Sequence, residues 1–347
     1  MLRRTIVPSV LLALVCACSP EPAATPKTWS VVMENLPGAL LSVWGTSSKD
    51  VWTVGGGDPK HPENGPQVLH WDGKAWTMLK TGVPGNLAWV THGATDDELW
   101  MVGFDGLILR YLRSTNKFVQ LPSNTKQWLW GVAVPDATDG WAVGGAPGCV
   151  GDTGGVVLHW DGTAWGATPG LDTTLQNSTA CWFKVFARAK NDVWIVGTGG
   201  HILHYDGTTW KAMDSGQSSK ATLLTVSGNA NLVIAVGGMG EGSIVENSGN
   251  GFVEKIPTGL QQLNGVFVEA NGDAVAVGGA GMGTVWQCKG GTWTQMSGTP
   301  EISQDFHGTW VDPDGGIWAV GGNLMTVPQT GGILAHFGAS QPASFTP

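Results

Sequence analysis

Charged side chains are scarce in this chain, and arginine and tyrosine are scarcer still. Of 347 residues, 13% are Asp, Glu, Lys or Arg and 2 are Tyr, and the formal net charge is −9. Beyond Arg3 and Arg4, the only arginines are Arg110, Arg113 and Arg188. A protein that binds a phosphate backbone needs clustered Lys and Arg, so we expect no nucleic-acid partner.

The shortage of these two residue types also restricts enzymatic function. A sialidase-like site needs several arginines around the substrate carboxylate and a tyrosine nucleophile, and here Tyr111 and Tyr205 fall at repeated hairpin positions. The sequence contains no nucleophile elbow, metal-ligand spacing or phosphate loop, so we expect no metal and no cofactor. A polysaccharide-active hydrolase or lyase remains an alternative, but a non-catalytic role is favoured.

The chain has no hydrophobic run of the roughly 20 residues that a membrane-spanning helix requires. Its first segment instead places Arg3 and Arg4 before a short apolar run over 6–15, as in a signal peptide. The sequence Val-Cys-Ala-Cys at 15–18 follows and resembles the lipobox of bacterial lipoproteins, in which a small residue precedes an invariant cysteine. An ordinary secretory signal with two stray cysteines is the alternative interpretation.

The lipobox resemblance implies cleavage before Cys18, acylation of its thiol and amine, and an extracytoplasmic location. Two acyl chains anchor a protein stably, because each buried methylene contributes about 0.8 kcal/mol. Ser19 rather than Asp follows Cys18, which favours the outer membrane. We therefore predict a signal peptide over 1–18 and a tether over 19–27, with the membrane as a partner through the anchor.

Glycine and tryptophan are abundant, with 53 and 19 residues, and they occur in a repeated phrase, Trp-x-Val-Gly. Its valines are 40 to 53 residues apart, close to the period of about 40–45 residues that is typical of β-propellers. Five copies carry the Trp, and two degenerate copies lack it. The five are at 50–56, 98–103, 140–145, 192–197 and 317–322, and the two are at 233–238 and 274–279.

Each copy has the same order of segments: an apolar run, the repeated phrase, a Gly-rich loop, and a closing hairpin. The clearest hairpins, at 68–76, 157–165 and 202–210, contain Asp-Gly, which predicts a two-residue type I′ turn. Four antiparallel strands per copy predict an all-β fold, a seven-bladed propeller over 28–338. The last copy lacks its final strand, and we expect the strand at 28–32 to supply it, leaving a C-terminal tail over 339–347 and a monomeric protein.

The Trp-x-Val-Gly and His-x-Asp-Gly-x-x-Trp repeats resemble the secreted and lipid-anchored bacterial propellers grouped with Asp-box (BNR-type) or kelch-like proteins. The resemblance covers almost all of the chain after the signal segment and implies the same fold. Most tryptophans then have packing roles. His70, His159 and His204 share one hairpin position, so we interpret them as bonding to turns rather than as metal ligands.

Candidate binding residues are those that break the repeat on the face where the loops leading into each blade meet the channel. Lys184 is the one charge predicted on a channel-facing column that otherwise holds Ser42, Val90, Gly131, Thr225, Gly265 and Gly308. The alternative is that Trp128 and Trp182 cap the inner core. The other candidates are Trp128, Trp182, Gln262, Asp305 and His307, and, from the loop at 57–66, Asp58, His61 and Glu63.

Aromatic planes combined with amide and acidic groups suit recognition of a sugar or a peptide. We therefore predict a binding or scaffolding module for a surface glycan or a protein, with an assembly factor for a membrane complex as a further alternative. Cysteine use fits an oxidising compartment: Cys149 and Cys181 are predicted to form a disulfide between neighbouring blades, and Cys288 to be a buried free thiol.

Overall fold

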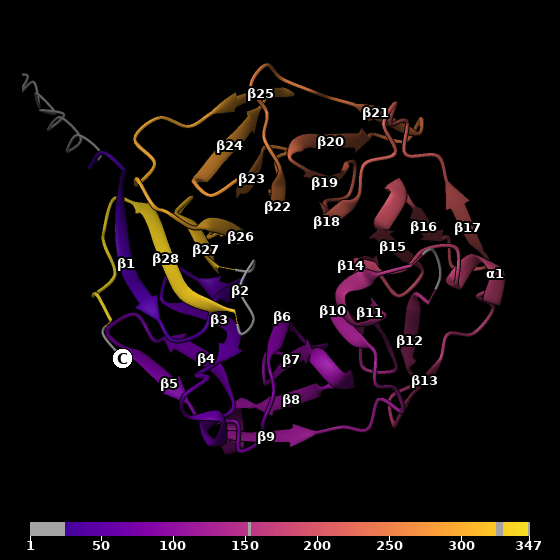
Figure 1. Ribbon diagram of the computed structural model, residues 1–347, viewed down its shortest axis with the longest axis horizontal. Helices are drawn as coiled ribbons and strands as arrows, with labels where there is room; N and C mark the ends of the chain where they lie inside the picture. Colours follow the sequence, from indigo (N-terminus) through magenta and orange to yellow (C-terminus); the bar gives the residue numbers. More distant parts are fainter. Residues whose placement is uncertain (1–24, 152–153, 324–328, 346–347) are drawn as a thin grey trace, which may run out of the picture.

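The computed structural model describes residues 25–151, 154–323 and 329–345, and it is a ring of seven four-stranded antiparallel sheets (Figure 1). Cys18 and the predicted signal segment lie outside the described residues. No helix in the described part of the chain is long and apolar enough to cross a bilayer. The predicted seven-bladed propeller is confirmed.

Each of the first six blades is continuous in sequence and runs from the channel outward. Blades 1 to 3 are β2 (Leu40–Ser47), β3 (Asp50–Gly57), β4 (Pro66–Trp71) and β5 (Trp76–Leu79); β6 (Leu87–His92), β7 (Glu98–Gly103), β8 (Ile108–Leu112) and β9 (Lys117–Gln120); and β10 (Trp128–Asp136), β11 (Asp139–Gly145), β12 (Val156–Trp160) and β13 (Trp165–Ala167). Blades 4 to 6 are β14 (Trp182–Ala189), β15 (Asp192–Gly197), β16 (Ile202–Tyr205) and β17 (Trp210–Met213); β18 (Leu223–Gly228), β19 (Val233–Met239), β20 (Glu241–Asn247) and β21 (Phe252–Glu254); and β22 (Leu263–Val268), β23 (Ala274–Gly279), β24 (Gly283–Lys289) and β25 (Thr292–Gln295). The short helices are η1 (Pro62–Asn64), η2 (Phe104–Gly106), η3 (Arg113–Thr115), η4 (Pro147–Cys149), α1 (Thr173–Gln176) and η5 (Thr198–Gly200).

Blade 7 joins the two ends of the described chain. Its strands are β26 (Asp305–Val311), β27 (Ile317–Asn323), β28 (Thr330–Gly338) and, outermost, β1 (Thr28–Leu36). Trp29 of β1 lies opposite Phe337 of β28, so the predicted closure is confirmed. The following residues are not a free tail, because Gln341 bonds to the backbone of Thr28 and the Phe345 amide donates to Val32 O. These contacts add a second tie at the point where the ring closes.

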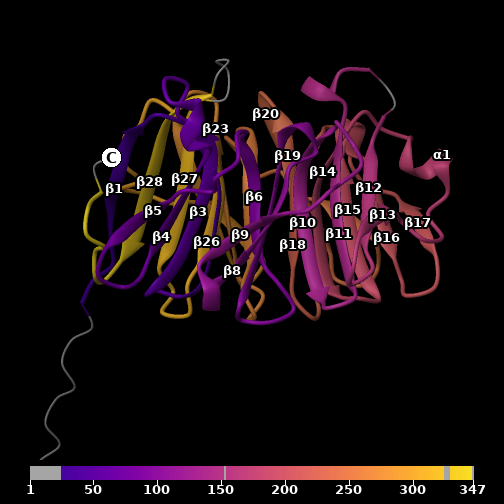
Figure 2. The same cartoon turned by 90° about the horizontal axis from the view of Figure 1, so that it is seen from below.

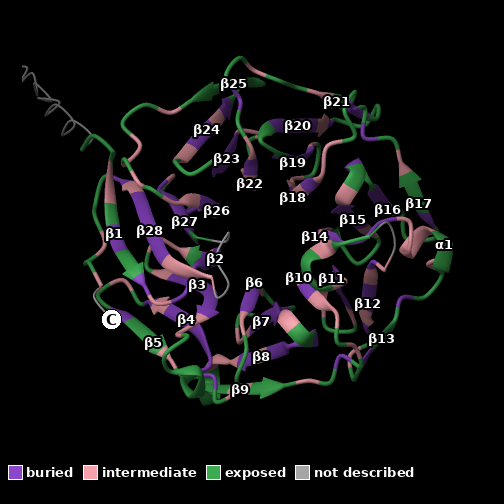
Figure 3. Ribbon diagram, in the orientation of Figure 1, coloured by how far each residue is buried: buried purple, intermediate pink, exposed green. Residues whose placement is uncertain are grey.

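The repeated phrase forms the second strand of every blade, and this strand is buried along almost its whole length (Figure 3). Both faces of a blade are covered by its neighbours, which is why the phrase is a continuous apolar and glycine run without polar alternation. The hydrophobic clusters lie between blades: Trp100 of β7, for example, packs with Leu129 of β10 and Trp165 of β13. The core is thus a series of sandwiches between adjacent sheets.

The closing hairpins lie where they were predicted, but their turn type is different. Trp71 pairs with Trp76, which leaves a four-residue loop, and Gly73 has a φ of +87° while Asp72 stays outside the left-handed region. The Asp72 carboxylate accepts hydrogen bonds from the Lys74 and Ala75 amides at 2.8 Å. The aspartate therefore caps the turn with its side chain, which a two-residue type I′ turn does not require.

We call the two rims of the ring the loop face and the turn face. The loop face carries the loops that lead into each innermost strand and those between second and third strands, and the turn face carries the other connections (Figure 2). Thr28 pairs with Gly338 and Leu36 with Gly332, so β1 runs from the turn face to the loop face. Lys27 therefore lies at the turn face, where its ammonium donates to Asp314 O and Gly315 O at 2.7 Å.

Candidate functional site

The innermost strands share an irregularity close to the loop face. In every blade one residue is skipped in the register with the second strand, as between Leu129 and Gly131 of β10. The skipped residues occupy equivalent places around the channel mouth, and their chemistry is not repeated. In blade order they are Leu41, Ala88, Trp130, Phe183, Leu224, Asn264 and His307.

One half of this mouth is aromatic. The Trp128 ring stacks on Phe104 of η2, with centroids 4.1 Å apart, and Phe104 also contacts Trp130 at 5.1 Å. Trp130 continues the series to Phe183 of blade 4 at 5.8 Å. All four rings are only partly buried. The predicted residue Trp128 is thus part of a continuous aromatic cluster on blades 2 to 4.

The half formed by blades 6 and 7 is polar, and its side chains bond to one another and to the backbone. Gln262 Nε2 donates to Asn264 Oδ1 at 2.8 Å, and Asn264 Nδ2 donates to Phe306 O at 2.7 Å. The Asp305 carboxylate accepts from the Gly281 amide at 2.5 Å. Blades 3 and 4 lie across the ring from blades 6 and 7 (Figure 1), so the polar and aromatic groups belong to opposite sides of the ring.

His307 belongs to the polar half but is buried. Its Nε2 lies 3.2 Å from Gly322 O, and because a carbonyl oxygen can only accept, Nε2 carries the proton. Burial lowers the pKa of His307 to about 4. The imidazole is neutral at pH 7 and does not offer a positive charge to a ligand.

Lys184 projects from β14 across the inner surface of the ring, but it is only 6% exposed. Its Nζ donates to Trp130 O at 3.1 Å and lies 3.2 Å from the centre of the Trp89 ring. The prediction that Val90 belongs to the same channel-facing column is wrong. The skipped residue shifts the register of β6, so Trp89 occupies the column and Val90 is in the core. Burial lowers the pKa of Lys184 well below its usual value, and the side chain links three blades.

Trp182 is not available to a ligand, so its predicted binding role is wrong in this structure. The residue is 0% exposed and packs with Trp141 and Val143 between blades 3 and 4. Its Nε1 donates to Gln176 O of α1 at 2.8 Å. Trp182 takes the place that Leu40 has in blade 1, one position before the skipped residue, and therefore caps the inner core.

The candidates from the loop at 57–66 lie away from the mouth. His61 and Glu63 are exposed and pair with each other at 3.1 Å across η1. Asp58 lines a separate pocket of about 290 Å³, together with Met78 and Lys80 from the outer edge of blade 1. The structure therefore does not bring these three residues together with Trp128, Gln262 and Asp305.

The loop face also carries exposed apolar side chains that were not among the predicted residues. Met239 is 82% exposed, Met282 is 66% exposed, and Val150 is 72% exposed. Each methionine sits between two glycines at the turn between the second and third strands, in blades 5 and 6. The signal that could have identified them is the sequence Gly-Met-Gly, which occurs at this turn in both blades.

The disulfide joins the loop face of blades 3 and 4, as predicted. Cys149 of η4 and Cys181 are bonded, with an Sγ–Sγ distance of 2.03 Å. Cys288 is a buried free thiol. Within 25–151, 154–323 and 329–345, no group of three or more His, Cys, Asp or Glu is placed to hold a metal ion.

The turn face has a different character, because one hydrogen-bonded group recurs on it. In five blades a carboxylate accompanies a second-strand Trp and a third-strand His or Arg that lie opposite each other. The Trp donates to the carboxylate in four of them, whereas in blade 3 only His159 of the two bonds to Asp139, and Trp141 Nε1 has no partner among the described residues. We call these groups the turn-face triads. They are Asp50–Trp52–His70, Glu98–Trp100–Arg110, Asp139–Trp141–His159, Asp192–Trp194–His204 and Asp312–Trp318–His336.

The triad of blade 1 shows how the group works. Trp52 Nε1 donates to Asp50 Oδ1 at 2.9 Å, His70 Nε2 lies 2.7 Å from the same oxygen, and the two rings stack at 3.9 Å. Burial alone would raise the pKa of Asp50, but the bonds from His70 and Thr46 and the charge of Arg113 outweigh it, and the pKa is strongly lowered. His70, His159 and His204 therefore bond to carboxylates at the start of the second strand and not to turns.

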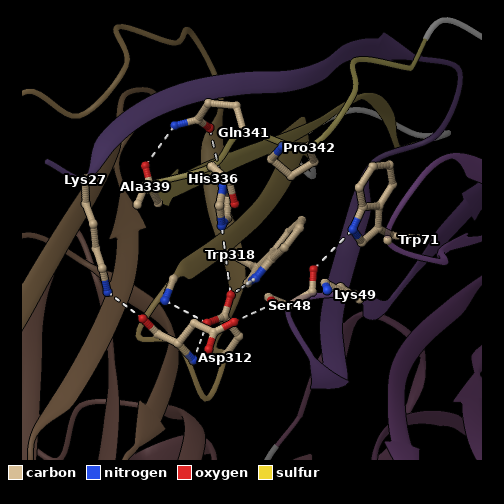
Figure 4. A pocket seen from close by; sticks show the side chains of 15 residues that line it. Lys27, Ser48, Lys49, Trp71, Asp312, Trp318, His336, Ala339, Gln341 and Pro342 are labelled. Atoms are coloured by element: carbon tan, nitrogen blue, oxygen red, sulfur yellow. Dashed lines mark hydrogen bonds and ion pairs between the residues drawn. The ribbon is translucent and has the colours of Figure 1, made fainter. Parts of the chain in front are cut away.

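A pocket of about 230 Å³ opens on the turn face at the seam between blades 7 and 1 (Figure 4). Asp312, Trp318 and His336 of the blade 7 triad form one wall. Trp71 and Lys49 of blade 1 form the other, and Lys27 closes one end. None of these residues was predicted as a site residue.

Comparison with known proteins supports the propeller fold but no family and no function. No family model matches this chain, and no curated protein matches it. Among solved structures, the WD40 repeats of RRP9 give a TM-score of 0.65 at 10% identity, covering 91% of this chain and 98% of that one. YCF48 from Cyanidioschyzon merolae gives 0.63 at 13% identity, covering 90% and 98%, and the WD40 propeller domain of Doa1 gives 0.63 at 12%, covering 88% and 96%.

Proposed function

We propose that this protein is a non-catalytic docking module, held at an extracytoplasmic membrane surface by acylated Cys18, and that its loop face binds a protein partner. The observation that carries the docking role is the channel mouth, where the aromatic cluster of Phe104, Trp128, Trp130 and Phe183 is only partly buried. Aromatic residues and methionine are enriched where protein interfaces are buried.

The exposed tips of the loop face favour a protein over a glycan. Met239, Met282 and Val150 project from three blades and offer no group that can bond to sugar hydroxyls. Flexible methionines adapt to irregular apolar partner surfaces. In the polar half of the mouth, Gln262 and Asn264 already bond to each other. If the partner is a membrane complex, this role includes that of an assembly factor.

The position of the tether supports the orientation. Lys27 lies at the turn face, and the nine residues of the predicted tether span at most about 30 Å. An anchor at Cys18 keeps the turn face on the membrane side and directs the loop face away from the membrane. The apolar tips then project toward partners and not toward the lipid.

A surface glycan is the second candidate. The partly exposed indole of Trp128 is a side chain of the kind that stacks on sugar rings, and Asp305 offers a carboxylate from the opposite half of the mouth. This alternative requires Trp128 and Asp305 and does not require Met239 or Met282. Binding measurements on variants of these residues separate the two candidates.

Site-specific photocrosslinking in cells tests the docking role. A photoreactive phenylalanine at Met239 or at Met282 should crosslink the same protein, while one at Asp161, an exposed turn-face residue, should not. Trp128→Ala should weaken this crosslink about 10-fold or more, as truncation of an interface anchor does. Cys18→Ser should release the protein from the membrane fraction. Identical crosslinks from both faces, or none from either methionine, would overturn the proposal.

A further inference from the structure

The turn-face triads differ in how the negative charge of the carboxylate is balanced. In four of them a Lys or Arg lies beside the carboxylate. Arg113 Nη1 is 3.0 Å from Asp50, Arg110 Nη2 is 2.7 Å from Glu98, Lys190 Nζ is 3.9 Å from Asp139, and Arg188 pairs with Asp192. A nearby cation is therefore the usual condition of this carboxylate, which is partly buried in all four.

Two of these cations also contact the indole of their triad. The Arg113 guanidinium carbon lies 5.3 Å from the centre of the Trp52 ring, and that of Arg110 lies 5.5 Å from the centre of the Trp100 ring. A guanidinium within about 6 Å of an indole face is attracted by the ring. Carboxylate, indole and guanidinium thus form a combination that the protein builds twice.

Asp312 of blade 7 lacks such a cation. It is 3% exposed, and it accepts hydrogen bonds from Trp318 Nε1 and from the Gly316 and Asp314 amides at 2.8–2.9 Å. Burial raises its pKa, but these bonds and the nearby His336 outweigh burial and lower it, so Asp312 is an anion at pH 7. Among the described residues, no Lys or Arg forms an ion pair with it.

His336 does not complete this triad as His70 completes that of blade 1. It is 4% exposed, and its Nε2 is 4.0 Å from Asp312 Oδ2, beyond hydrogen-bond distance, with no other partner. Both groups line the pocket at the seam of blades 7 and 1 (Figure 4). A buried anion and an unpartnered ring nitrogen therefore face the same space.

The pocket corresponds to a place that is filled at the next seam. Arg113, which neutralises Asp50 of blade 1, comes two residues after Tyr111 in the outer hairpin of blade 2. The residue at this place in blade 1 is Gly73, two residues after Trp71, and Gly73 lines the pocket. Because Gly73 has no side chain, no guanidinium reaches Asp312 from blade 1.

We propose that this pocket binds a guanidinium group between the Asp312 and Asp314 carboxylates, beside the almost fully buried indole of Trp318. Its volume of about 230 Å³ is below the range of about 300–1,000 Å³ typical of drug-sized ligands, and suits one side chain or one amino acid. Asp314 adds a second carboxylate at the rim, whereas Lys27 and Lys49 oppose a cation. The site lies on the opposite face from the docking surface and does not depend on it.

The described part of the chain offers no free guanidinium to this pocket, and Arg3 and Arg4 belong to the predicted signal peptide, outside the described residues. All three arginines of the described chain are ion-paired within the ring, Arg110 with Glu98, Arg113 with Asp50 and Arg188 with Asp192. A second copy of the propeller therefore has none to offer. The source is either an arginine side chain of a partner protein or a free guanidinium compound such as arginine, whose carboxylate Lys49 could receive.

Titration of the purified protein, labelled with ¹⁵N in its tryptophans, tests the site. N-acetyl-L-argininamide should shift the Trp318 indole signal in a saturable way, with a dissociation constant in the range of about 1–10 mM. The neutral isostere N-acetyl-L-citrullinamide should bind about 10-fold more weakly or not at all. Free L-arginine binding more tightly than the capped compound identifies an amino-acid ligand, and weaker or equal binding identifies a protein side chain.

Two exposed variants with opposite effects keep the test independent of folding. Asp314→Asn should weaken binding of N-acetyl-L-argininamide about 2- to 5-fold, and Lys49→Gln should strengthen binding of this capped compound by a similar factor, as expected for exposed charges near a cationic ligand. Asp161→Asn removes the same charge from the same face at a distant blade and should change nothing. No saturable shift, an equal response to the citrulline compound, or failure of the opposite signs at Asp314 and Lys49 would overturn the proposal.

Discussion

The two faces of the ring are built on different principles. The turn face repeats one chemical group, since five of its seven blades bring together a carboxylate, an indole and a His or Arg. The loop face repeats only its backbone: the skipped residue of each innermost strand ranges from Ala88 to Trp130. Side chains that recur in blade after blade meet a need common to all blades, which is packing and strand pairing.

The same comparison shows where specificity resides. A residue that occurs in one blade, such as Trp128 or Met239, is not required by the repeat. The two degenerate blades support this distinction, because they replace the triad with Ile234 opposite Glu246 and Val275 opposite Gln287 and still form regular sheets. Departures from the repeat are therefore tolerated by the fold, and those on the exposed loop face are free to serve binding.

The largest effect is expected where the loop face depends on a covalent bond. Replacing both Cys149 and Cys181 with Ser should lower the free energy of unfolding by about 3–4 kcal/mol, because the 32-residue separation closes a long loop in the unfolded chain. Urea denaturation measures the loss, and reductant should destabilise the native protein but not the double variant. Equal sensitivity of both proteins to reductant would contradict a stabilising bond.

The turn face is tested by breaking one triad and its degenerate counterpart. Asp192→Ala should lower the free energy of unfolding by about 3 kcal/mol, because Trp194 Nε1 and His204 lose their acceptor and Arg188 its counter-charge. The control is Asp273→Ala at the same position in blade 6, where neither Trp nor His is present. Its cost should be about 1 kcal/mol or less. Similar losses for the two variants would show that the triad is not the stabilising unit.

The features that depend on the repeat could be predicted from the sequence, since each blade has the same internal order. The number of blades and the pairing of Trp29 with the last blade follow from the spacing and from the missing final strand. The triads could be predicted only in part. Trp194 and His204 recur visibly, but Asp312 directly follows β26 and replaces the carboxylate that the other four triads carry two residues before the Trp. Gly316 stands at that place, and a Cβ there would lie 2.4 Å from the Asp312 carboxylate.

The site was harder to predict because it depends on register and on contacts between blades. The skipped residue changes which side chain faces the channel, so that Trp89 replaces Val90 and Trp182 enters the core. Ion pairs such as that of Arg113 with Asp50, 63 residues apart, leave no periodic signal. The role of a charge or glycine that is not repeated becomes apparent only when neighbouring blades are placed side by side.

The smallest effect concerns pH, and it separates the two faces because their buried groups titrate in different ranges. On the loop face, the pKa of His307 is about 4, below the value of about 6.5 in an unfolded chain. The unfolded state therefore binds the proton more readily, and stability falls as the pH drops from 6.5 toward 4. On the turn face, the lowered pKa of Asp50 and of Asp312 makes stability fall only below about pH 4.

Between pH 7 and pH 5, the His307 effect should amount to about 2 kcal/mol of unfolding free energy. His307→Gln keeps a donor for Gly322 O and should remove this loss, while leaving the fall below pH 4 unchanged. Burial and Lys220 lower the pKa of His201, which adds to the loss of stability at low pH. Burial raises the pKa of Glu269, which acts in the opposite sense. The relevant quantity is therefore the difference in unfolding free energy between the variant and the native protein. Urea denaturation at pH 7, 5 and 3.5 measures it. If His307→Gln flattened the curve below pH 4 instead, the acid response of the loop face would not be separable from that of the turn-face carboxylates.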